Sequence, residues 1–222
     1  MRTLTEIMNE NDSDKGTVVC EAHGYTLLYE EWFDPMRGDP IRLLEIGVCD
    51  PHKPGASLEG WYEYFPNARI FGFDIVDAKR FERDRVETFI GDQSSAKDLT
   101  RFVKECGSGF DIIVDDGSHA DMHQQASLAF LFDHVKAHGQ YIIEDMHVSP
   151  GTLQLMFELQ RRLEFPARKG ILKGRGRDLS DLVQNRRIEG RHMSRRVISR
   201  LAQQIESIEV VCDNKLARIV KS

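Results

Sequence analysis

The chain has 222 residues, of which 30% are charged, and a formal net charge of −6. This length is sufficient for one large α/β domain with its own core, and the acidic balance argues against a general nucleic-acid-binding protein. Because the sequence lacks both a run of about 18 apolar residues and an apolar N-terminal leader, we expect neither a transmembrane helix nor a secretory signal.

Four cysteines are scattered along the chain without a Cys-x-x-Cys pair. This spacing is typical of a reducing compartment and predicts neither a disulfide framework nor a zinc finger. We therefore expect a cytoplasmic protein that does not depend on disulfide bonds.

The first part of the chain is predicted to form an N-terminal arm, residues 1–35. Residues 1–24 are polar and contain the stretch Asp12-Ser-Asp-Lys-Gly16. An aromatic-rich helix is predicted to follow, at 25–33. Aromatic side chains dominate buried area, so packing of this helix onto the domain is the simpler interpretation, with substrate contact as the alternative.

Beyond the arm, short apolar runs alternate with amphipathic stretches. We predict strands at 41–47, 68–74, 86–90, 110–115 and 140–144. Helices are predicted at 57–65, 94–103, 119–137 and 151–163. Two alternating runs around Asp213-Asn214, at 205–211 and 215–220, predict a closing hairpin. This order favours a doubly wound, Rossmann-like α/β sheet of seven strands with a C-terminal antiparallel hairpin.

The turn after the first strand is typical of the entrance to a nucleotide site, because a glycine, Gly47, precedes a helix N-terminus. Ser57 is the predicted N-cap of that helix. The Gly-x-Gly-x-x-Gly pattern of a pyrophosphate cradle is absent after Gly47. The ligand expected here therefore carries no phosphates.

The next two strands also end in polar or permissive residues. Asp74 stands where an acid hydrogen-bonds ribose hydroxyls in such sheets, with capping of the next turn as the alternative. Gly91 lets the backbone approach a flat ligand, while Asp92 and Gln93 offer hydrogen-bonding groups to an adenine edge.

Acids also close the fourth and fifth strands. Neighbouring parallel strand ends lie about 5 Å apart, so Asp116, Glu144 and Asp145 are expected to share one site at the carboxyl edge of the sheet. Three crowded carboxylates repel one another, which makes a cation the natural partner. An all-oxygen set favours a hard ion such as Mg²⁺.

A strongly basic segment lies near the C-terminus. Residues 161–200 hold 13 Lys and Arg against four acids, a net charge of +9, while the remainder of the chain carries −15. We predict a basic helical insertion at about 161–201 within a single domain, 1–222. A solvated helix face is the simplest interpretation; the alternative is a wall that meets an anionic substrate or a partner subunit.

Six segments together resemble the metal-dependent sugar O-methyltransferases of antibiotic biosynthesis. That group includes the mycinamicin, macrocin, rhamnosyl-tetracenomycin and noviose enzymes and the cephalosporin hydroxylase-like proteins. The segments, which span about residues 12–147, are Leu43-Leu-Glu-Ile-Gly-Val48, Gly55-Ala-Ser-Leu58, Phe71-Gly-Phe-Asp-Ile75, Gly91-Asp-Gln-Ser94, Asp115-Asp-Gly-Ser-His119 and Ile143-Glu-Asp145. The resemblance implies a class I methyltransferase that uses S-adenosylmethionine (SAM) and Mg²⁺ to methylate a hydroxyl of a sugar or glycosylated metabolite. It also implies a homo-oligomer.

The resemblance further implies a role for each matching residue. The implied SAM-binding residues are Glu45, Gly47 and Ser57 at the methionine part, Asp115 at its amino group, Asp74 at the ribose, and Gly91, Asp92 and Gln93 at the adenine. The implied metal ligands are Asp116, Glu144 and Asp145. His119 would be the general base, because a sugar hydroxyl is a poor nucleophile until Mg²⁺ lowers its pKa and a histidine takes its proton.

The histidines also have structural interpretations. His119 could be a helix N-terminal residue with a local hydrogen bond. His123 shares a helix face with it and is interpreted as structural. His147 is either an ordinary loop residue or part of the site, and the sequence does not favour either alternative.

Two other functions compete with methyl transfer. A mononuclear iron oxygenase could use two of the histidines and one carboxylate, but it leaves Asp74 and the stretch 91–93 without a role. A nucleic-acid-binding protein could use the basic segment, but that segment lacks interleaved aromatic residues.

Overall fold

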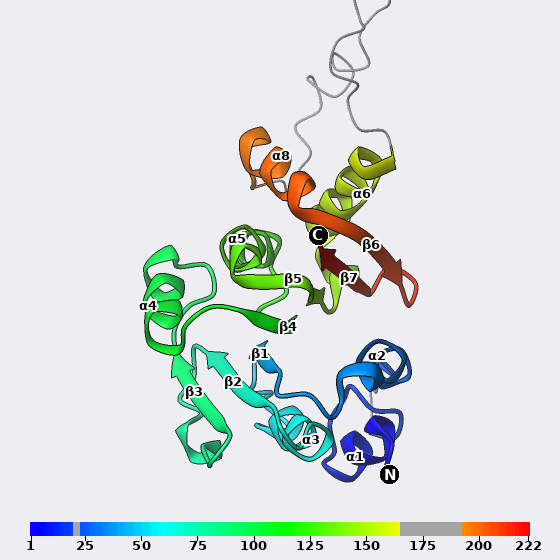
Figure 1. Ribbon diagram of the computed structural model, residues 1–222, viewed down its shortest axis with the longest axis vertical. Helices are drawn as coiled ribbons and strands as arrows, with labels where there is room; N and C mark the ends of the chain where they lie inside the picture. The colour runs from blue at the N-terminus through cyan, green and yellow to red at the C-terminus, as the bar shows by residue number, and fades with distance from the viewer. Residues whose placement is uncertain (20–22, 165–191) are drawn as a thin grey trace, which may run out of the picture.

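A seven-stranded sheet forms the centre of the molecule (Figure 1). The computed structural model describes residues 1–19, 23–164 and 192–222. The strands are β1 (Arg42–Ile46), β2 (Arg69–Asp74), β3 (Val86–Ile90), β4 (Phe110–Asp115), β5 (Val135–Ile143), β6 (Ile205–Val211) and β7 (Leu216–Lys221). Their order in the sheet is β3-β2-β1-β4-β5-β7-β6, and β7 runs antiparallel to both of its neighbours. The predicted doubly wound sheet with its C-terminal hairpin is confirmed.

Helices cover both faces of this sheet. The α-helices are α1 (Leu4–Glu10), α2 (Thr26–Phe33), α3 (Ala56–Tyr64), α4 (Ala96–Cys106), α5 (Asp121–Leu131), α6 (Pro150–Glu164) and α8 (Arg195–Gln204). Short 3₁₀ turns are η1 (Asp34–Met36), η2 (Lys79–Phe81), η3 (Phe132–His134) and η4 (Met146–Val148). Within the described ranges, no helix is both long and apolar enough to cross a bilayer.

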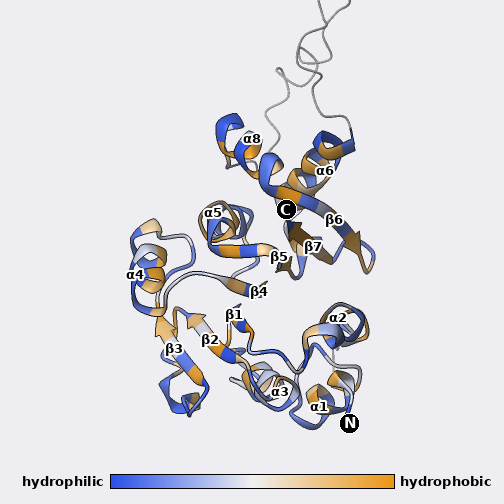
Figure 2. Cartoon of the chain, in the orientation of Figure 1, coloured by the Kyte–Doolittle hydropathy of each residue, from blue (hydrophilic) through white to orange (hydrophobic). Residues whose placement is uncertain are grey.

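Each face of the sheet has its own hydrophobic core. Helices α1, α2 and α3 pack on one face, and α4, α5, α6 and α8 pack on the other. Side chains alternate between the faces along a strand, so in β1 Leu43 belongs to the first core and Leu44 to the second. Figure 2 shows that α4, α6 and α8 carry both hydrophobic and hydrophilic residues, as expected for helices that lie on the outside of a sheet.

The N-terminal arm is more ordered than its polar composition suggests. Thr3 and Glu6 form a capping box at the start of α1, in which each side chain accepts a hydrogen bond from the other residue's backbone N–H. Leu4, Ile7 and Met8 follow the i, i+3, i+4 spacing of one helix face and are 0–2% exposed. The arm therefore contributes a helix to the core.

Several element boundaries differ from the predictions; the helix predicted at 119–137 differs most, because α5 covers only Asp121–Leu131. Helix α3 begins one residue early, with Gly55 as its N-cap at φ 79°, so the predicted N-cap role of Ser57 is wrong. A Cβ at Gly55 would overlap the Phe81 ring, which explains the glycine. Strand β5 begins at Val135 instead of 140, because α5 ends at Leu131 and a 3₁₀ turn follows.

Most of the predicted basic insertion, residues 165–191, lies outside the described residues. Its final part is helix α8, which begins after Ser194. The Ser194 hydroxyl accepts a hydrogen bond from the Val197 N–H, the usual contact of an N-cap serine.

Candidate active site

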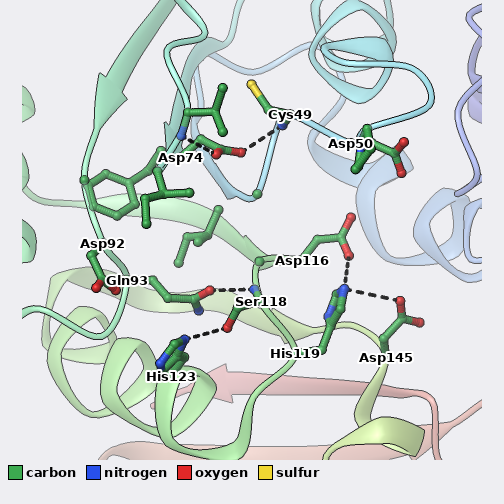
Figure 3. Close-up of a pocket in the computed structure, with 18 of the residues that line it drawn as sticks. Cys49, Asp50, Asp74, Asp92, Gln93, Asp116, Ser118, His119, His123 and Asp145 are labelled. Carbon is green, nitrogen blue, oxygen red and sulfur yellow. Dashed lines mark hydrogen bonds and ion pairs between the residues drawn. The ribbon is translucent and has the colours of Figure 1, made fainter.

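Two cavities lie side by side at the carboxyl end of the parallel strands. The first, of about 360 Å³, lies over the ends of β1, β2, β3 and β4 (Figure 3). The second, of about 690 Å³, lies between residues of the N-terminal arm (12–15, 19 and 23) and the β1–α3 loop. Both cavities are lined by the same six residues: Asp14, Gly47, Asp50, Asp116, His119 and Asp145. These residues therefore mark the junction between the cavities.

Gly47 and Asp74 shape the first cavity. Gly47 has φ 83°, and a Cβ there would overlap the Asp116 carbonyl oxygen, so only glycine fits this turn. Asp74 Oδ2 accepts the backbone N–H groups of Val48 and Cys49, each at 2.8 Å. Asp74 Oδ1 accepts the Val76 N–H at 2.8 Å. Asp74 thus lines the cavity, and its hydrogen bonds hold two of the loops that form the rim, as the capping alternative expects. Its contact with a ribose stays a prediction.

The β3–α4 turn forms a second side of this cavity. Gly91, Asp92 and Gln93 all line it, as expected from their place after β3. Asp92 Oδ1 accepts hydrogen bonds from the backbone N–H and the hydroxyl of Ser94, and these bonds lower the pKa of Asp92. Asp92 is therefore charged and faces the cavity, where it suits a hydrogen-bond donor of a ligand.

Gln93 has both ends of its amide engaged within the protein. Its Oε1 accepts the Ser118 N–H at 2.8 Å, and its Nε2 donates to Asp115 Oδ1 at 2.9 Å. Asp115 is fully buried and also accepts hydrogen bonds from the Ser127 and Tyr141 hydroxyls. Asp115 lines neither cavity, and its expected contact with the SAM amino group stays a prediction. Its side chain points to the α5 side of the sheet.

Removal of the Asp115 carboxylate should destabilise the fold rather than only weaken ligand binding. Asp115→Ala leaves the Tyr141 hydroxyl buried without its acceptor and leaves Gln93 Nε2 with only a 3.4 Å contact to the Ser127 hydroxyl, at about 1–3 kcal/mol for each group. We expect the free energy of unfolding to fall by about 3 kcal/mol, measured by urea denaturation. Asp133→Ala, which breaks an exposed ion pair with Arg200, serves as the control and should cost less than about 1 kcal/mol. Equal effects of the two changes would contradict the prediction.

Asp116, His119 and Asp145 converge at the cavity junction. One ligand atom from each lies within 4.8 Å of the others. His119 Nε2 is 3.7 Å from Asp145 Oδ2 and 4.0 Å from Asp116 Oδ1 (Figure 3). His119 Nδ1 is buried without a hydrogen-bond partner among the described residues. The nitrogen that faces the junction is therefore Nε2.

The backbone at this junction is in an uncommon conformation. His119 and Asp145 both have φ 55°, in the left-handed region that few residues other than glycine adopt. The Ser149 hydroxyl donates to the His119 carbonyl and holds one of these turns. Such strain is frequent at functional sites.

Glu144 lies deeper than the other two predicted metal ligands. It is 1% exposed, and its Oε1 accepts a 2.5 Å hydrogen bond from the Tyr29 hydroxyl. Its Oε2 is 3.0 Å from Lys15 Nζ. Asp145 Oδ1 in turn accepts a 2.6 Å hydrogen bond from the Tyr25 hydroxyl. The structure thus brings the three predicted ligands close together and surrounds them with groups from the N-terminal arm.

Lys15, Tyr25 and Tyr29 are the residues that the sequence analysis missed. The i, i+4 spacing of the two tyrosines places them on one helix face, and Lys15 lies in the short acidic stretch noted above. Both tyrosines are packed in the core, as predicted for this helix, but their hydroxyls reach the acids. The packing interpretation is confirmed for these two side chains, and substrate contact stays a prediction.

Burial dominates the electrostatics of this cluster. Burial raises the pKa of Asp116 and Glu144, although the Lys15 ammonium opposes the shift. Burial alone would lower the pKa of Lys15, but Asp116, Glu144 and Glu45 together raise it well above its usual value. Lys15 is therefore a permanent cation.

Glu45 lies beneath the site and lines neither cavity. Its Oε2 accepts hydrogen bonds from the Ser57 hydroxyl at 2.7 Å and the Trp61 indole at 3.1 Å. Ser57 does line the second cavity. The predicted contacts of Glu45 and Ser57 with a methionine chain remain predictions, with Ser57 the nearer of the two to open space.

Stability should fall as the pH rises through the titration of Glu45. Burial raises the pKa of Glu45 from 4.5 to about 7, so the folded state binds more protons than the unfolded chain between these values. The contribution of Glu45 to the free energy of unfolding is therefore largest below about pH 4.5. It decreases between pH 4.5 and pH 7, by about 3 kcal/mol. Urea unfolding of Glu45→Gln at pH 5 and pH 8, without divalent ions, should show a smaller decrease than the wild type. An unchanged difference would contradict this assignment.

Three other histidines, His23, His123 and His147, lie near the junction but outside the group formed by Asp116, His119 and Asp145. His123 lines the first cavity, and its Nδ1 lies 2.7 Å from the Ser118 hydroxyl. His23 Nδ1 and His147 Nδ1 lie 3.3 Å and 3.9 Å from Asp145 Oδ1. His147 is therefore close to the site, and His123 has the local partner that its structural interpretation requires.

Sequence comparison finds relatives over about half of the chain. A stretch of 127 residues is 42% identical to 8-demethyl-8-(2-methoxy-alpha-L-rhamnosyl)-tetracenomycin-C 3'-O-methyltransferase of Streptomyces olivaceus. A stretch of the same length is 42% identical to mycinamicin VI 2''-O-methyltransferase of Micromonospora griseorubida. Each match covers 56% of this chain but only 32% of the relative, so the match spans about a third of the length of these curated relatives. No protein-family model matches the sequence.

Structural comparison extends the likeness to the whole chain. The MycE methyltransferase of mycinamycin biosynthesis, solved with Mg, SAH and mycinamycin VI, matches with a TM-score of 0.75 and 27% identity. The match covers 100% of this chain and 55% of MycE. The chain has the class I methyltransferase fold. The resemblance to antibiotic-sugar O-methyltransferases that the six motifs indicated is confirmed.

Proposed function

We propose that the chain transfers a methyl group from SAM to a hydroxyl of a sugar or of a glycosylated metabolite, with a divalent cation in the site. The observation that carries the proposal is the junction of two cavities at Asp116, His119 and Asp145. A transfer reaction needs a donor and an acceptor that meet at one point, and the junction supplies that point.

The first cavity suits SAM. Its turn at Gly47 needs no phosphate cradle, because SAM carries no phosphate. Asp74 and Asp92 offer acceptors for hydroxyl and amino groups, while Phe73, Ile75 and Val76 line the same cavity with apolar surface. This pairing of polar ends and apolar walls is usual for small-molecule sites.

The donor set at the junction suits a divalent cation. The candidate metal set is the three acids predicted from the sequence, Asp116, Glu144 and Asp145. Ligand oxygens of Asp116 and Asp145 lie within 4.8 Å of each other, and Glu144 reaches the same Lys15 ammonium as Asp116. Such oxygen donors favour Mg²⁺, and Nε2 of His119 stays available to accept a proton. When bound, such an ion would lower the pKa of an acceptor hydroxyl.

His119 is proposed as the base that takes the hydroxyl proton. Its side chain is 30% exposed, and it faces the junction through Nε2. The acceptor would enter through the second cavity, whose walls include Asp12, His23 and Lys53. Polar groups of both kinds suit the hydroxyls of a sugar, which donate and accept hydrogen bonds.

Calorimetry and mass spectrometry test the proposed function. The chain should bind SAM, and incubation with SAM, Mg²⁺ and a panel of glycosides should add one methyl group to a member of the panel. A matched titration of 2-oxoglutarate, with Fe²⁺ at the same concentration in both solutions, should show no binding of 2-oxoglutarate. Binding in that titration together with none for SAM would favour the oxygenase alternative and refute the proposal.

Assembly is a separate part of the proposal. We expect a homo-oligomer that acts on a small-molecule glycoside and not on nucleic acid. Light scattering of the purified chain would measure its mass, and a monomer at micromolar concentration would contradict the expected assembly.

A further inference from the structure

Lys15 places a cation inside the acidic site, although the residue comes from the N-terminal arm. Its side chain is 1% exposed, and its Nζ lies 3.0 Å from Glu144 Oε2 and 3.4 Å from Glu45 Oε1. The same ammonium contacts Asp116 Oδ2. A lysine is almost never fully buried unless it is paired, and these three carboxylates are its partners.

The backbone around Lys15 fixes the position of this side chain. The Lys15 carbonyl accepts the Thr26 N–H at the start of α2, at 3.1 Å. The Lys15 N–H donates to the Ser13 hydroxyl at 3.4 Å. Both bonds hold Lys15 within the N-terminal arm. Its side chain therefore approaches the three acids from the arm, whereas the acids themselves belong to strands or strand ends.

We propose that Lys15 is a positioning residue that shares Asp116 and Glu144 with the divalent cation, and that it thereby weakens the binding of that cation. The inference rests on the cation of the proposed function but not on methyl transfer. Asp116 shows the sharing most directly, because its Oδ2 faces Lys15 while its Oδ1 faces His119. This carboxylate thus lies between the buried ammonium and the His119 imidazole.

Repulsion between the two cations sets the direction of the effect. Like charges a few ångströms apart repel strongly where water is excluded, so the ammonium opposes a divalent ion at Asp116. The acids do not depend on Lys15 alone for their orientation. The Tyr25 hydroxyl holds Asp145 and the Tyr29 hydroxyl holds Glu144. Loss of the charge should therefore strengthen cation binding instead of scattering the ligands.

Lys15→Met tests the proposal, because methionine keeps most of the length and removes the charge. Without divalent ions, the melting temperature should fall by about 10 °C, since the buried acids lose their counter-charge. Calorimetry at a fixed pH should then show Mg²⁺ binding at least about tenfold tighter than in the wild type. Mg²⁺ should also raise the melting temperature of the variant more than that of the wild type. Lys136→Met, which breaks an exposed 2.8 Å ion pair with Asp111, should change neither quantity.

Weaker or unchanged Mg²⁺ binding in Lys15→Met would overturn the proposal. If the variant folds only with Mg²⁺ present, the ion has replaced the ammonium and the proposal is supported. If the variant does not fold at all, the double variant Lys15→Met/Glu45→Gln removes one acid outside the candidate metal set and should fold. Failure of the double variant, or Mg²⁺ binding no tighter than wild type, would also overturn it. SAM binding and methyl transfer are measured separately on the wild type, so their absence would refute the proposed function without deciding the role of Lys15.

Discussion

His119→Ala is expected to lower turnover by about 100- to 10,000-fold, the range for loss of a positioned base. Nε2 of His119 lies between Asp116 and Asp145 at the cavity junction, where the acceptor hydroxyl would meet the methyl donor. The measurement is the steady-state rate with saturating SAM and Mg²⁺. Calorimetric affinity for SAM should change little, because the contacts assigned to SAM lie on other side chains.

His123→Ala is the matched control for this prediction. His123 lies one helical turn from His119 and also lines the first cavity, but it pairs with the Ser118 hydroxyl. Its replacement should cost much less turnover. Near-normal turnover in His119→Ala with a large loss in His123→Ala would show that the wrong histidine was chosen. Full activity in both would mean that no histidine base is required.

Asp116→Asn should abolish most of the activity and weaken the binding of Mg²⁺ by at least about tenfold, the usual lower bound even for a group that only orients a metal ligand. Asp116 is in the candidate metal set and contacts Lys15, so the amide removes one negative charge between two cations. Treatment of the wild type with EDTA should likewise abolish turnover, and added Mg²⁺ should restore it. SAM binding should survive chelation, because the ion is assigned to the acceptor.

Asp50→Asn provides the control for this change. Asp50 lines both cavities as Asp116 does, but it is not part of the candidate metal set. It should therefore leave Mg²⁺ affinity almost unchanged. Full turnover after exhaustive chelation would contradict the assignment of a metal to this site.

The central strands could be predicted because each is buried on both faces and reads as a short apolar run. Strand β4 was predicted with its observed bounds, Phe110–Asp115. Helix α1 was not predicted, although the capping box of Thr3 and Glu6 and the spacing of its three apolar residues are sequence signals for it; with only seven residues, the helix gives a short periodic pattern. Local pattern thus determines the sheet, whereas contacts distant in sequence determine the arm.

The sequence could predict those site residues that directly follow a predicted strand. Asp115 and Asp116 are adjacent, and side chains alternate along a strand, so only one of the two can face a given side. Asp115 shares the α5 side with Ile113, which belongs to that core, and alternation applied to this pair would have assigned it correctly. Lys15 lies 101 residues before Asp116, and no short sequence motif predicts a contact over that separation.

The two cavities are built from different parts of the chain. The floor of the first comes from turns that end the parallel strands, whose register fixes them, while one wall of the second is the segment that precedes the sheet. Substitutions in that wall leave the strand register untouched. On the proposed function, substitutions before the first strand would change the contacts of the acceptor without shifting the strand turns assigned to the donor.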